Sequence, residues 1–205
     1  MNVQNKVIVI TGGAGGIGSA QAKLLARNGA EVWILDLVQE KIDQLVEELK
    51  RQGGKAHGAV ADVTSEEEWK TIVERIVSES GRLDVVVNNA GFGISGAIEF
   101  TKTEDAKRLF DADFFGMVNV NRAVIPHMRQ AGAGRIVNLS SVAAAAPIPF
   151  QAYYSAAKAA VNSYTMALAN ELRPYGVTVC AVQPGDIHTG FTAAREKTID
   201  GDDVY

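Results

Sequence analysis

Short runs rich in Val and Ile alternate with longer segments of helical periodicity over almost the whole chain, and this alternation restricts the possible folds most. Most of the runs are continuously apolar, as expected for strands buried on both faces of a sheet. Between the runs, apolar residues such as Ile42, Leu45 and Leu49 recur at helical spacing. This alternation predicts a doubly wound α/β fold, a parallel sheet with crossover helices on both faces. The predicted strands are 6–10, 31–35, 55–60, 83–87, 135–139 and 177–182.

Length and composition indicate one ordinary folded domain spanning residues 1–205. The 205 residues are 47% hydrophobic and 21% charged, and the net charge of −4 provides no basic surface for nucleic acid or an anionic membrane. The single cysteine, Cys180, cannot form an internal disulfide, and no Cys/His spacing suggests a metal site. No apolar run approaches the roughly 18 residues of a membrane span, and the start of the chain does not resemble a signal peptide. We therefore expect a cytoplasmic domain that binds no nucleic acid, membrane or metal.

A glycine-rich segment, residues 11–18, separates the first predicted strand from the first predicted helix. Glycines at this place allow a tight turn, close approach of a pyrophosphate and close packing of helix on strand. Gly18 is followed directly by Ser19 and not by a lysine, which excludes a phosphate loop of the NTPase type. The segment predicts a dinucleotide-binding loop, and a turn that merely needs flexibility is the alternative. It fits three glycine patterns at once: GxGxxG (Gly13, Gly15, Gly18), TGxxxGxG (Gly12, Gly16, Gly18) and TGxxGxxG (Gly12, Gly15, Gly18).

Asp36 follows the second predicted strand, 18 residues after Gly18. An acidic side chain at this place accepts hydrogen bonds from the adenosine ribose hydroxyls and repels a 2′-phosphate. No Lys or Arg lies between Gly12 and Gly18, or just after Asp36, to bind that phosphate. NAD is therefore favoured over NADP. Capping of the following helix is an alternative role for Asp36, and both roles can hold together.

Four further motifs follow the later predicted strands or lie just beyond them. Open α/β sheets bind ligands at the carboxyl ends of their strands, so all four are expected at the ligand-binding edge. Tyr154 and Lys158 are four positions apart in a strongly helical stretch and so share one helix face. The motifs are Asn88-Asn89-Ala90-Gly91, Ser140-Ser141, Tyr154 with Lys158, and Pro184-Gly185.

In this order, from about residue 6 to residue 191, the motifs resemble the short-chain dehydrogenase/reductase family, specifically its non-extended branch. The serine 13 residues before Tyr154 and the NNAG sequence carry the resemblance together with the glycine loop, and they favour the TGxxxGxG pattern. The resemblance implies a Rossmann-type sheet whose usual seventh strand is absent here. It also implies a homodimer or homotetramer, and it makes 186–205 the start of an incomplete substrate-covering region.

The family's reaction is hydride transfer between a nicotinamide and a secondary alcohol or ketone. The resemblance implies that Tyr154 is the general acid and base, that Lys158 assists it and that Ser141 holds the substrate oxygen. Tyrosine ionises near pH 10, and an ammonium about 4 Å away contributes up to ~4 kcal/mol at an effective dielectric constant of ~20, which favours the tyrosinate. The implied cofactor contacts are Gly12, Gly16, Ile17, Gly18, Asp36, Asp62, Val63, Asn89, Tyr154, Lys158, Pro184, Gly185, Ile187 and Thr189.

Asp113 departs from the family pattern. The family usually has an asparagine here, which completes a proton relay through water to the lysine. An ionised aspartate accepts hydrogen bonds but does not donate them, and its charge would strengthen the Lys158 ammonium. We count Asp113 among the catalytic candidates, with a helix aspartate that faces solvent as the alternative.

These residues predict an NAD-dependent alcohol dehydrogenase or carbonyl reductase. The expected lining of the site is mostly apolar, which favours a small or medium hydrophobic substrate. Two alternatives stay open: a 3-oxoacyl-thioester reductase, which Asp36 disfavours because that role generally uses NADPH, and a non-catalytic NAD-binding regulatory module. The lining comprises Phe92, Ile94, Val142, the alanines at 143–146, Ile148 and Phe191.

Overall fold

A parallel sheet forms the centre of the molecule in the computed structural model, which describes residues 2–187 and 195–197. The strand order is β3-β2-β1-β4-β6-β7, and every neighbouring pair is parallel. Chain order reverses between β1 and β4, which makes the carboxyl ends of these two strands the expected ligand-binding crevice. The strands are β1 (Val7–Thr11), β2 (Glu31–Asp36), β3 (Lys55–Val60), β4 (Val85–Asn88), β6 (Gly134–Leu139) and β7 (Val177–Val182).

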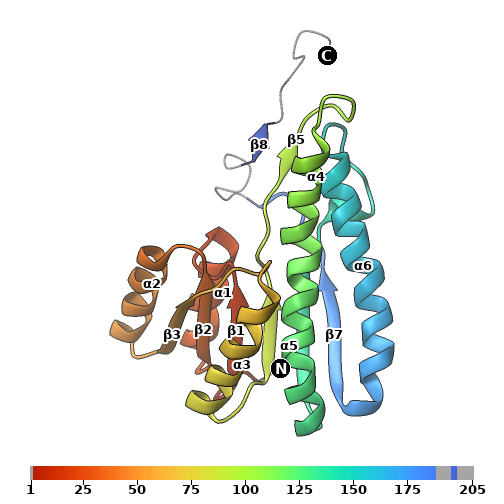
Figure 1. Cartoon of the computed structure of the whole chain (residues 1–205). Helices are drawn as coiled ribbons and strands as arrows, with labels where there is room; N and C mark the ends of the chain where they lie inside the picture. The colour runs from red at the N-terminus through yellow and green to blue at the C-terminus, as the bar shows by residue number, and fades with distance from the viewer. Residues whose placement is uncertain (1, 188–194, 198–205) are drawn as a thin grey trace.

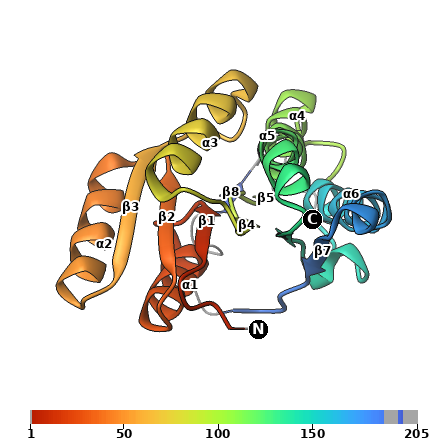
Figure 2. The ribbon, with the colours of Figure 1, turned by 90° about the horizontal axis from the view of Figure 1, so that it is seen from below.

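Helices cover both faces of this sheet (Figures 1 and 2). They are α1 (Gly16–Arg27), α2 (Gln39–Arg51), α3 (Glu66–Ser80), α4 (Thr103–Phe110), α5 (Gly116–Ala131) and α6 (Ala152–Leu172). The π-helix η1 (Asp111–Phe115) joins α4 to α5, and two 3₁₀-helices flank α6 in the chain: η2 (Val142–Ala144) before it and η3 (Arg173–Tyr175) after it.

Alternate residues of the central strands pack against different helices. Val7 and Val9 of β1 belong to a core formed with α3, α5 and α6, in which Trp69 is fully buried. Ile8 and Ile10 belong to a second core formed with α1 and α2. This division follows from the period of two along a strand, and burial on both faces explains why the strand sequences are continuously apolar.

The predicted doubly wound fold is confirmed, and all six predicted strands form the main sheet of the described residues. The structure adds a small parallel pair that the sequence does not predict, between β5 (Ile94–Ser95) and β8 (Glu196–Lys197). None of the helices in the described part of the chain combines the length and apolarity that a membrane span requires.

Candidate active site

The glycine loop links β1 to α1 and leaves little room for side chains. Gly12 has a φ of +59°, and a Cβ on it would lie 2.9 Å from the Cα of Ala90. A Cβ on Gly18 would lie 2.2 Å from the carbonyl oxygen of Gly12. Gly12 and Gly18 are therefore required for the close approach of the loop to its neighbours.

The amino end of α1 is open to an anion. Its N-cap is Gly15, which offers no side-chain hydrogen bond, and its first turn contains no acidic residue. The N–H groups of a helix's first turn and the helix dipole favour a negative ligand. The loop that begins at Gly12 thus has the features of the predicted phosphate site, which includes Gly16 and Ile17.

Asp36 connects the end of β2 to this loop. One carboxylate oxygen accepts a hydrogen bond from the N–H of Ala14 at 3.0 Å, and the other accepts one from the N–H of Leu37 at 2.8 Å. Each carboxylate oxygen has two acceptor sites, so capacity remains for hydroxyl donors. The half-buried Asp36 therefore suits a ribose as well as the loop that it supports.

Asn89 holds the glycine loop from the side of β4. Its side-chain amide donates to the carbonyl oxygens of Thr11 and Gly12, both at 3.1 Å. The hydroxyl of Thr11 accepts hydrogen bonds from the N–H groups of Asn89 and Ala90, both at 3.0 Å. Asn89, predicted to lie beside the ribose, thus fixes the loop's backbone in this structure.

The remaining predicted cofactor residues lie at the same carboxyl edge but have local roles as well. Asp62 accepts hydrogen bonds from both the N–H and the hydroxyl of Thr64, at 2.8 Å each. Val63 packs closely against Gly116, since a Cβ on that glycine would lie 2.6 Å from the Val63 side chain. The carbonyl oxygen of Pro184 accepts from the N–H of Val142 at 3.1 Å, which joins the segment after β7 to η2. Gly185 and Ile187 are exposed, and Thr189 lies outside the described residues.

Ser140 and Ser141 follow β6 and have different partners. The Ser141 hydroxyl accepts a hydrogen bond from the N–H of Ala143 at 3.1 Å and caps η2. The Ser140 hydroxyl donates to the carbonyl oxygen of Lys158 at 3.0 Å and so holds α6. A hydroxyl that accepts one hydrogen bond still has its own proton to donate, so Ser141 can bind a substrate oxygen.

Tyr154 and Lys158 lie one turn apart on α6, as predicted. The Lys158 ammonium nitrogen lies 5.6 Å from the centre of the Tyr154 ring and donates to the carbonyl oxygen of Leu139 at 3.1 Å. Lys158 is buried, whereas Tyr154 is half-buried beside Leu109 and Ala157. The lysine is thus fixed against the end of β6, with its ammonium near the tyrosine ring.

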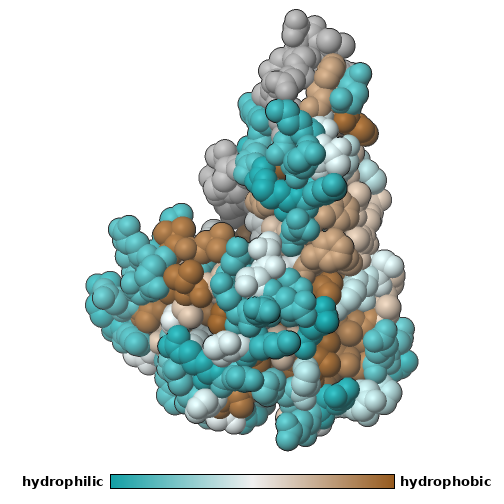
Figure 3. Space-filling model, in the orientation of Figure 1, coloured by the Kyte–Doolittle hydropathy of each residue, from teal (hydrophilic) through white to brown (hydrophobic). Residues whose placement is uncertain are grey.

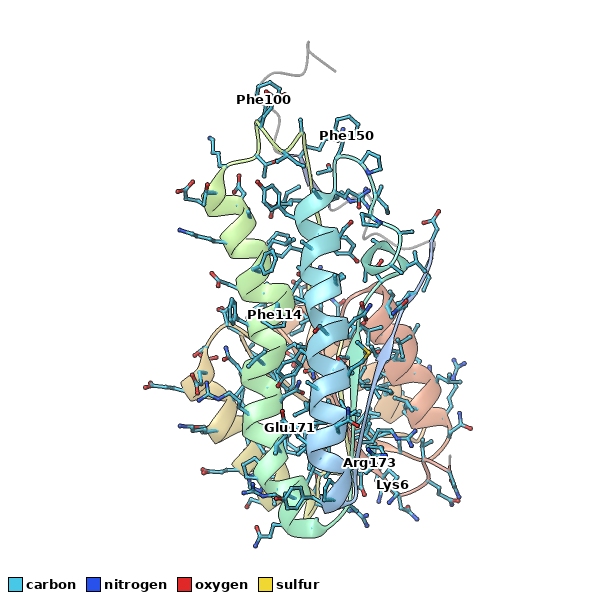
Figure 4. All side chains as sticks on the ribbon, turned by 90° about the vertical axis from the view of Figure 1, so that its right-hand side faces the viewer. Lys6, Phe100, Phe114, Phe150, Glu171 and Arg173 are labelled. Atoms are coloured by element: carbon cyan, nitrogen blue, oxygen red, sulfur yellow. The ribbon has the colours of Figure 1, made fainter. Side chains whose placement is uncertain are left out.

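Asp113 joins this group from η1. Its carboxylate oxygen Oδ2 lies 3.0 Å from Nζ of Lys158, and Oδ1 accepts a hydrogen bond from the N–H of Phe92 at 2.9 Å. Burial raises the pKa of Asp113 above its ordinary value, although the positive charge of Lys158 opposes this effect. The alternative of a solvent-facing aspartate is wrong, because the Asp113 side chain is fully buried. Figure 4 shows α5 and α6 side by side, and the edge-to-face contact of Phe114 with Tyr164 joins η1 to α6.

The sequence profile of the short chain dehydrogenase family matches residues 6–200. This chain belongs to the short-chain dehydrogenase family. The predicted resemblance is thereby confirmed, and the class of chemistry expected at this site is oxidation and reduction.

Individual members of the family resemble this short-chain dehydrogenase closely. A 3-ketodihydrosphingosine reductase from Bacteroides thetaiotaomicron is 42% identical over 193 residues, which cover 94% of this chain and 68% of the relative. A cyclopentanol dehydrogenase from Comamonas sp. is 43% identical over 190 residues, 93% of this chain and 76% of the relative. The crystal structure of an NAD⁺-bound xylitol dehydrogenase superimposes with a TM-score of 0.90 at 33% identity and covers 94% of this chain and 74% of that one.

A buried polar network of the short-chain dehydrogenase was not predicted from the sequence. The Asn88 amide donates to the side-chain oxygens of Asn121 and Asn138, at 2.7 and 2.8 Å. Asn138 in turn donates to the hydroxyl of Thr165 at 2.9 Å. Because Asn88 and Asn138 are direct partners in the β4–β6 register, the network fixes the ends of the strands that carry Asn89 and Leu139. The signal that could have indicated the network is that Asn88 and Asn138 both lie near the end of a predicted strand.

The predicted apolar lining needs correction at two positions, and one of them is Ala143, which is fully buried. Ile94 is only 2% exposed and packs among core residues with Leu109 and Ala157, so it supports the site from behind. Val142 and Ile148 are 44% and 39% exposed and are available to a ligand. Phe92 is half-buried with the guanidinium of Arg108 over its ring at 5.0 Å, while Phe191 lies outside the described residues.

Proposed function

We propose that this short-chain dehydrogenase transfers a hydride between NAD(H) and a secondary alcohol or ketone, with Tyr154 as general acid and base. The observation that carries the proposal is the placement of a buried Lys158 ammonium 5.6 Å from the Tyr154 ring, one turn away on α6. The proposed substrate is small or medium-sized and hydrophobic. Exposed Val142 and Ile148 near the site, and the resemblance to a cyclopentanol dehydrogenase, support that choice.

Three residues of the chain have separate roles in proton transfer and in binding of the substrate oxygen. In reduction, the Tyr154 hydroxyl gives its proton to the carbonyl oxygen, and in oxidation the tyrosinate takes the proton of the alcohol. The Lys158 ammonium stabilises the tyrosinate, and the Ser141 hydroxyl donates a hydrogen bond to the substrate oxygen and polarises it. The carbonyl of Leu139 and the hydroxyl of Ser140 hold Lys158 in position through its ammonium and its backbone.

The residues of the glycine loop and its surroundings fit a dinucleotide. The first turn of α1 carries neither an acidic residue nor a side-chain cap, and a Cβ at Gly18 would collide with the loop. We assign the pyrophosphate to the Gly12–Gly18 loop and the adenosine ribose to Asp36, and we favour NAD because a 2′-phosphate would meet the Asp36 carboxylate. When bound, the nicotinamide supplies or accepts the hydride.

We also propose that the chain forms a homodimer or homotetramer. Figure 3 shows hydrophobic patches on the α6 side of the column formed by α5 and α6, among hydrophilic and neutral surface. Met166 of α6 is 65% exposed and Phe115, next to α5, is 52% exposed, which suits burial against another copy. The cytoplasmic location expected from the sequence stays a prediction.

The proposed activity is tested by incubating the protein with NAD and a series of secondary alcohols that includes cyclopentanol, and with NADH and the matching ketones. We expect the absorbance of reduced nicotinamide to change with at least one pair. A protein that binds NAD but turns over no alcohol and no ketone would contradict the proposal and favour the non-catalytic module.

A further inference from the structure

The Asp113 carboxylate is held on several sides. Oδ2 lies 3.0 Å from Nζ of Lys158, and Oδ1 accepts from the N–H of Phe92. Gly91 faces the same group, since a Cβ on Gly91 would lie 2.9 Å from each carboxylate oxygen. With no exposed side-chain surface, Asp113 is a built part of the site and not a flexible surface charge.

With one proton shared between them, Asp113 and Lys158 together carry no net charge. If the shared proton is on the lysine, the charges are +1 and −1; if it moves to the carboxylate, both groups are neutral. Either arrangement leaves the sum of the two charges at zero. With an amide in place of the carboxylate, the protonated lysine would present a full positive charge to Tyr154.

The other charged side chains on the elements packed against α6 do not neutralise Lys158 in place of Asp113. Asp111, on the same π-helix, is exposed. Arg108 of α4 is paired with Asp105 and Glu196, while Glu104 and Lys107 are exposed. On the sheet side, Arg135 lies at the opposite end of β6 from Leu139 and donates to Thr178. Among the described residues, Asp113 is thus the carboxylate paired with Lys158.

We propose, on the basis of the proposed function, that Asp113 is a positioning residue that neutralises Lys158 and keeps the Tyr154 phenol protonated, which favours carbonyl reduction. A neutral pair acts on the tyrosinate as a dipole, whose effect is weaker than that of a net positive charge at the same distance. In reduction, the Tyr154 O–H bond breaks and its proton forms the new O–H bond of the alcohol; reduced nicotinamide, when bound, would supply the hydride that the carbonyl carbon gains. The tyrosinate then recovers a proton from solvent.

The proposal is tested by titrating the cofactor-free protein and following tyrosinate absorbance, with a Tyr154→Phe titration subtracted to isolate Tyr154. We expect Asp113→Asn to lower the midpoint of Tyr154 ionisation by about one pH unit, the smallest shift typical of a charge within a few ångströms. Asp111→Asn, on the same element but exposed, is the matched control and should leave the midpoint unchanged. An unchanged or higher midpoint in Asp113→Asn overturns the proposal.

Two further measurements test whether Asp113 acts on Tyr154 through Lys158. In a Lys158→Met background, Asp113→Asn should no longer lower the midpoint of Tyr154 ionisation; an equal shift there overturns the role of the pair.

Asparagine has the shape of aspartate and can still accept a hydrogen bond from the Phe92 N–H, and circular dichroism verifies that Asp113→Asn folds. If Asp113→Asn does not fold, the ¹³C signal of the Asp113 carboxyl is compared between the unaltered protein and Lys158→Met. The signal must differ between the two, and no difference overturns the pairing. Neither readout uses turnover, so failure of the proposed enzymatic activity is detected separately.

Discussion

The carboxylate of Asp36 and the backbone N–H of Ala14 form a 3.0 Å hydrogen bond that ties the end of β2 to the glycine loop. One acidic side chain thereby serves the backbone of the loop and faces the place proposed for the adenosine ribose. Because this position sets the charge that a 2′-phosphate would meet, we propose that it governs the choice between the two nicotinamide cofactors.

We predict that NAD stabilises the unaltered protein against heat more than NADP does at equal concentration. A ligand at a hundredfold excess over its Kd adds about 2.7 kcal/mol to the free energy of unfolding, so differential scanning fluorimetry resolves the difference. Asp36→Ser should reduce the difference between stabilisation by NAD and stabilisation by NADP. Asp43→Ser, at an exposed position of α2, should leave this difference unchanged. Equal or stronger stabilisation by NADP would show that Asp36 does not select the cofactor.

Asp84 is predicted to stabilise the fold in a pH-dependent way. Burial alone would raise the pKa of Asp84, but hydrogen bonds from Arg82, the N–H of Val7 and Lys6 lower it below the ordinary value. A depressed pKa means that this stabilisation is present above the ordinary pKa of about 4 and is lost as the pH falls through the folded-state value. We expect Asp84→Asn to lower the free energy of unfolding by about 1–3 kcal/mol at neutral pH.

Urea unfolding at a series of pH values checks this prediction. The difference between the unaltered protein and Asp84→Asn should shrink as the solution becomes acidic. The exposed Asp43→Asn is the control and should change little. A loss of stability that is the same at every pH would mean that the charge of Asp84 is irrelevant.

The ion pair of Arg108 with Glu196 is predicted to hold β8 against β5. The guanidinium donates to both carboxylate oxygens of Glu196, and the N–H of Glu196 donates to the carbonyl oxygen of Gly93 at 3.0 Å. Both side chains are about half exposed, so a contribution of about 0.2–1 kcal/mol is expected. Arg108→Met should therefore accelerate tryptic cleavage after Arg195 and Lys197 by up to about fivefold.

Mass spectrometry of timed digests measures this cleavage. Glu196→Gln should have a similar effect, and the double variant should add little, because the two residues act through one contact. Arg75→Met breaks a comparable exposed pair with Glu79 on α3 and is the control. Additive effects of the two single changes would argue against the pair.

The sheet was predictable because its strands carry their own signal. A continuously apolar run such as Ile8 to Ile10 can be buried on both faces only in a covered sheet. The strand ends were less predictable, since Thr11 and Asn88 extend β1 and β4 with polar side chains that are buried by cross-strand partners. Such pairing depends on residues far away in the sequence and leaves no local pattern.

The residues proposed for the candidate site could be named from the sequence, but the contacts that they make in the structure could not. Helical spacing indicates Tyr154 and Lys158, whereas nothing in the periodicity near Asp113 indicates the π-helix that contains it. The direct contact of Asp113 with Lys158 depends on the packing of η1 against α6, and hence on the tertiary structure. The pair β5–β8 is missed for a similar reason, because two-residue strands have no period.

The most direct test of the proposed mechanism is the turnover of Tyr154→Phe compared with Tyr153→Phe. Tyr153 is adjacent and packs in the same cluster, so it controls for the loss of a hydroxyl near the site. We predict that Tyr154→Phe lowers kcat by about 100-fold or more, as expected for loss of a general acid and base, while thermal stabilisation by NAD is retained. Tyr153→Phe should keep kcat within a few-fold. Activity retained in Tyr154→Phe, or lost equally in both variants, would contradict the assignment of Tyr154.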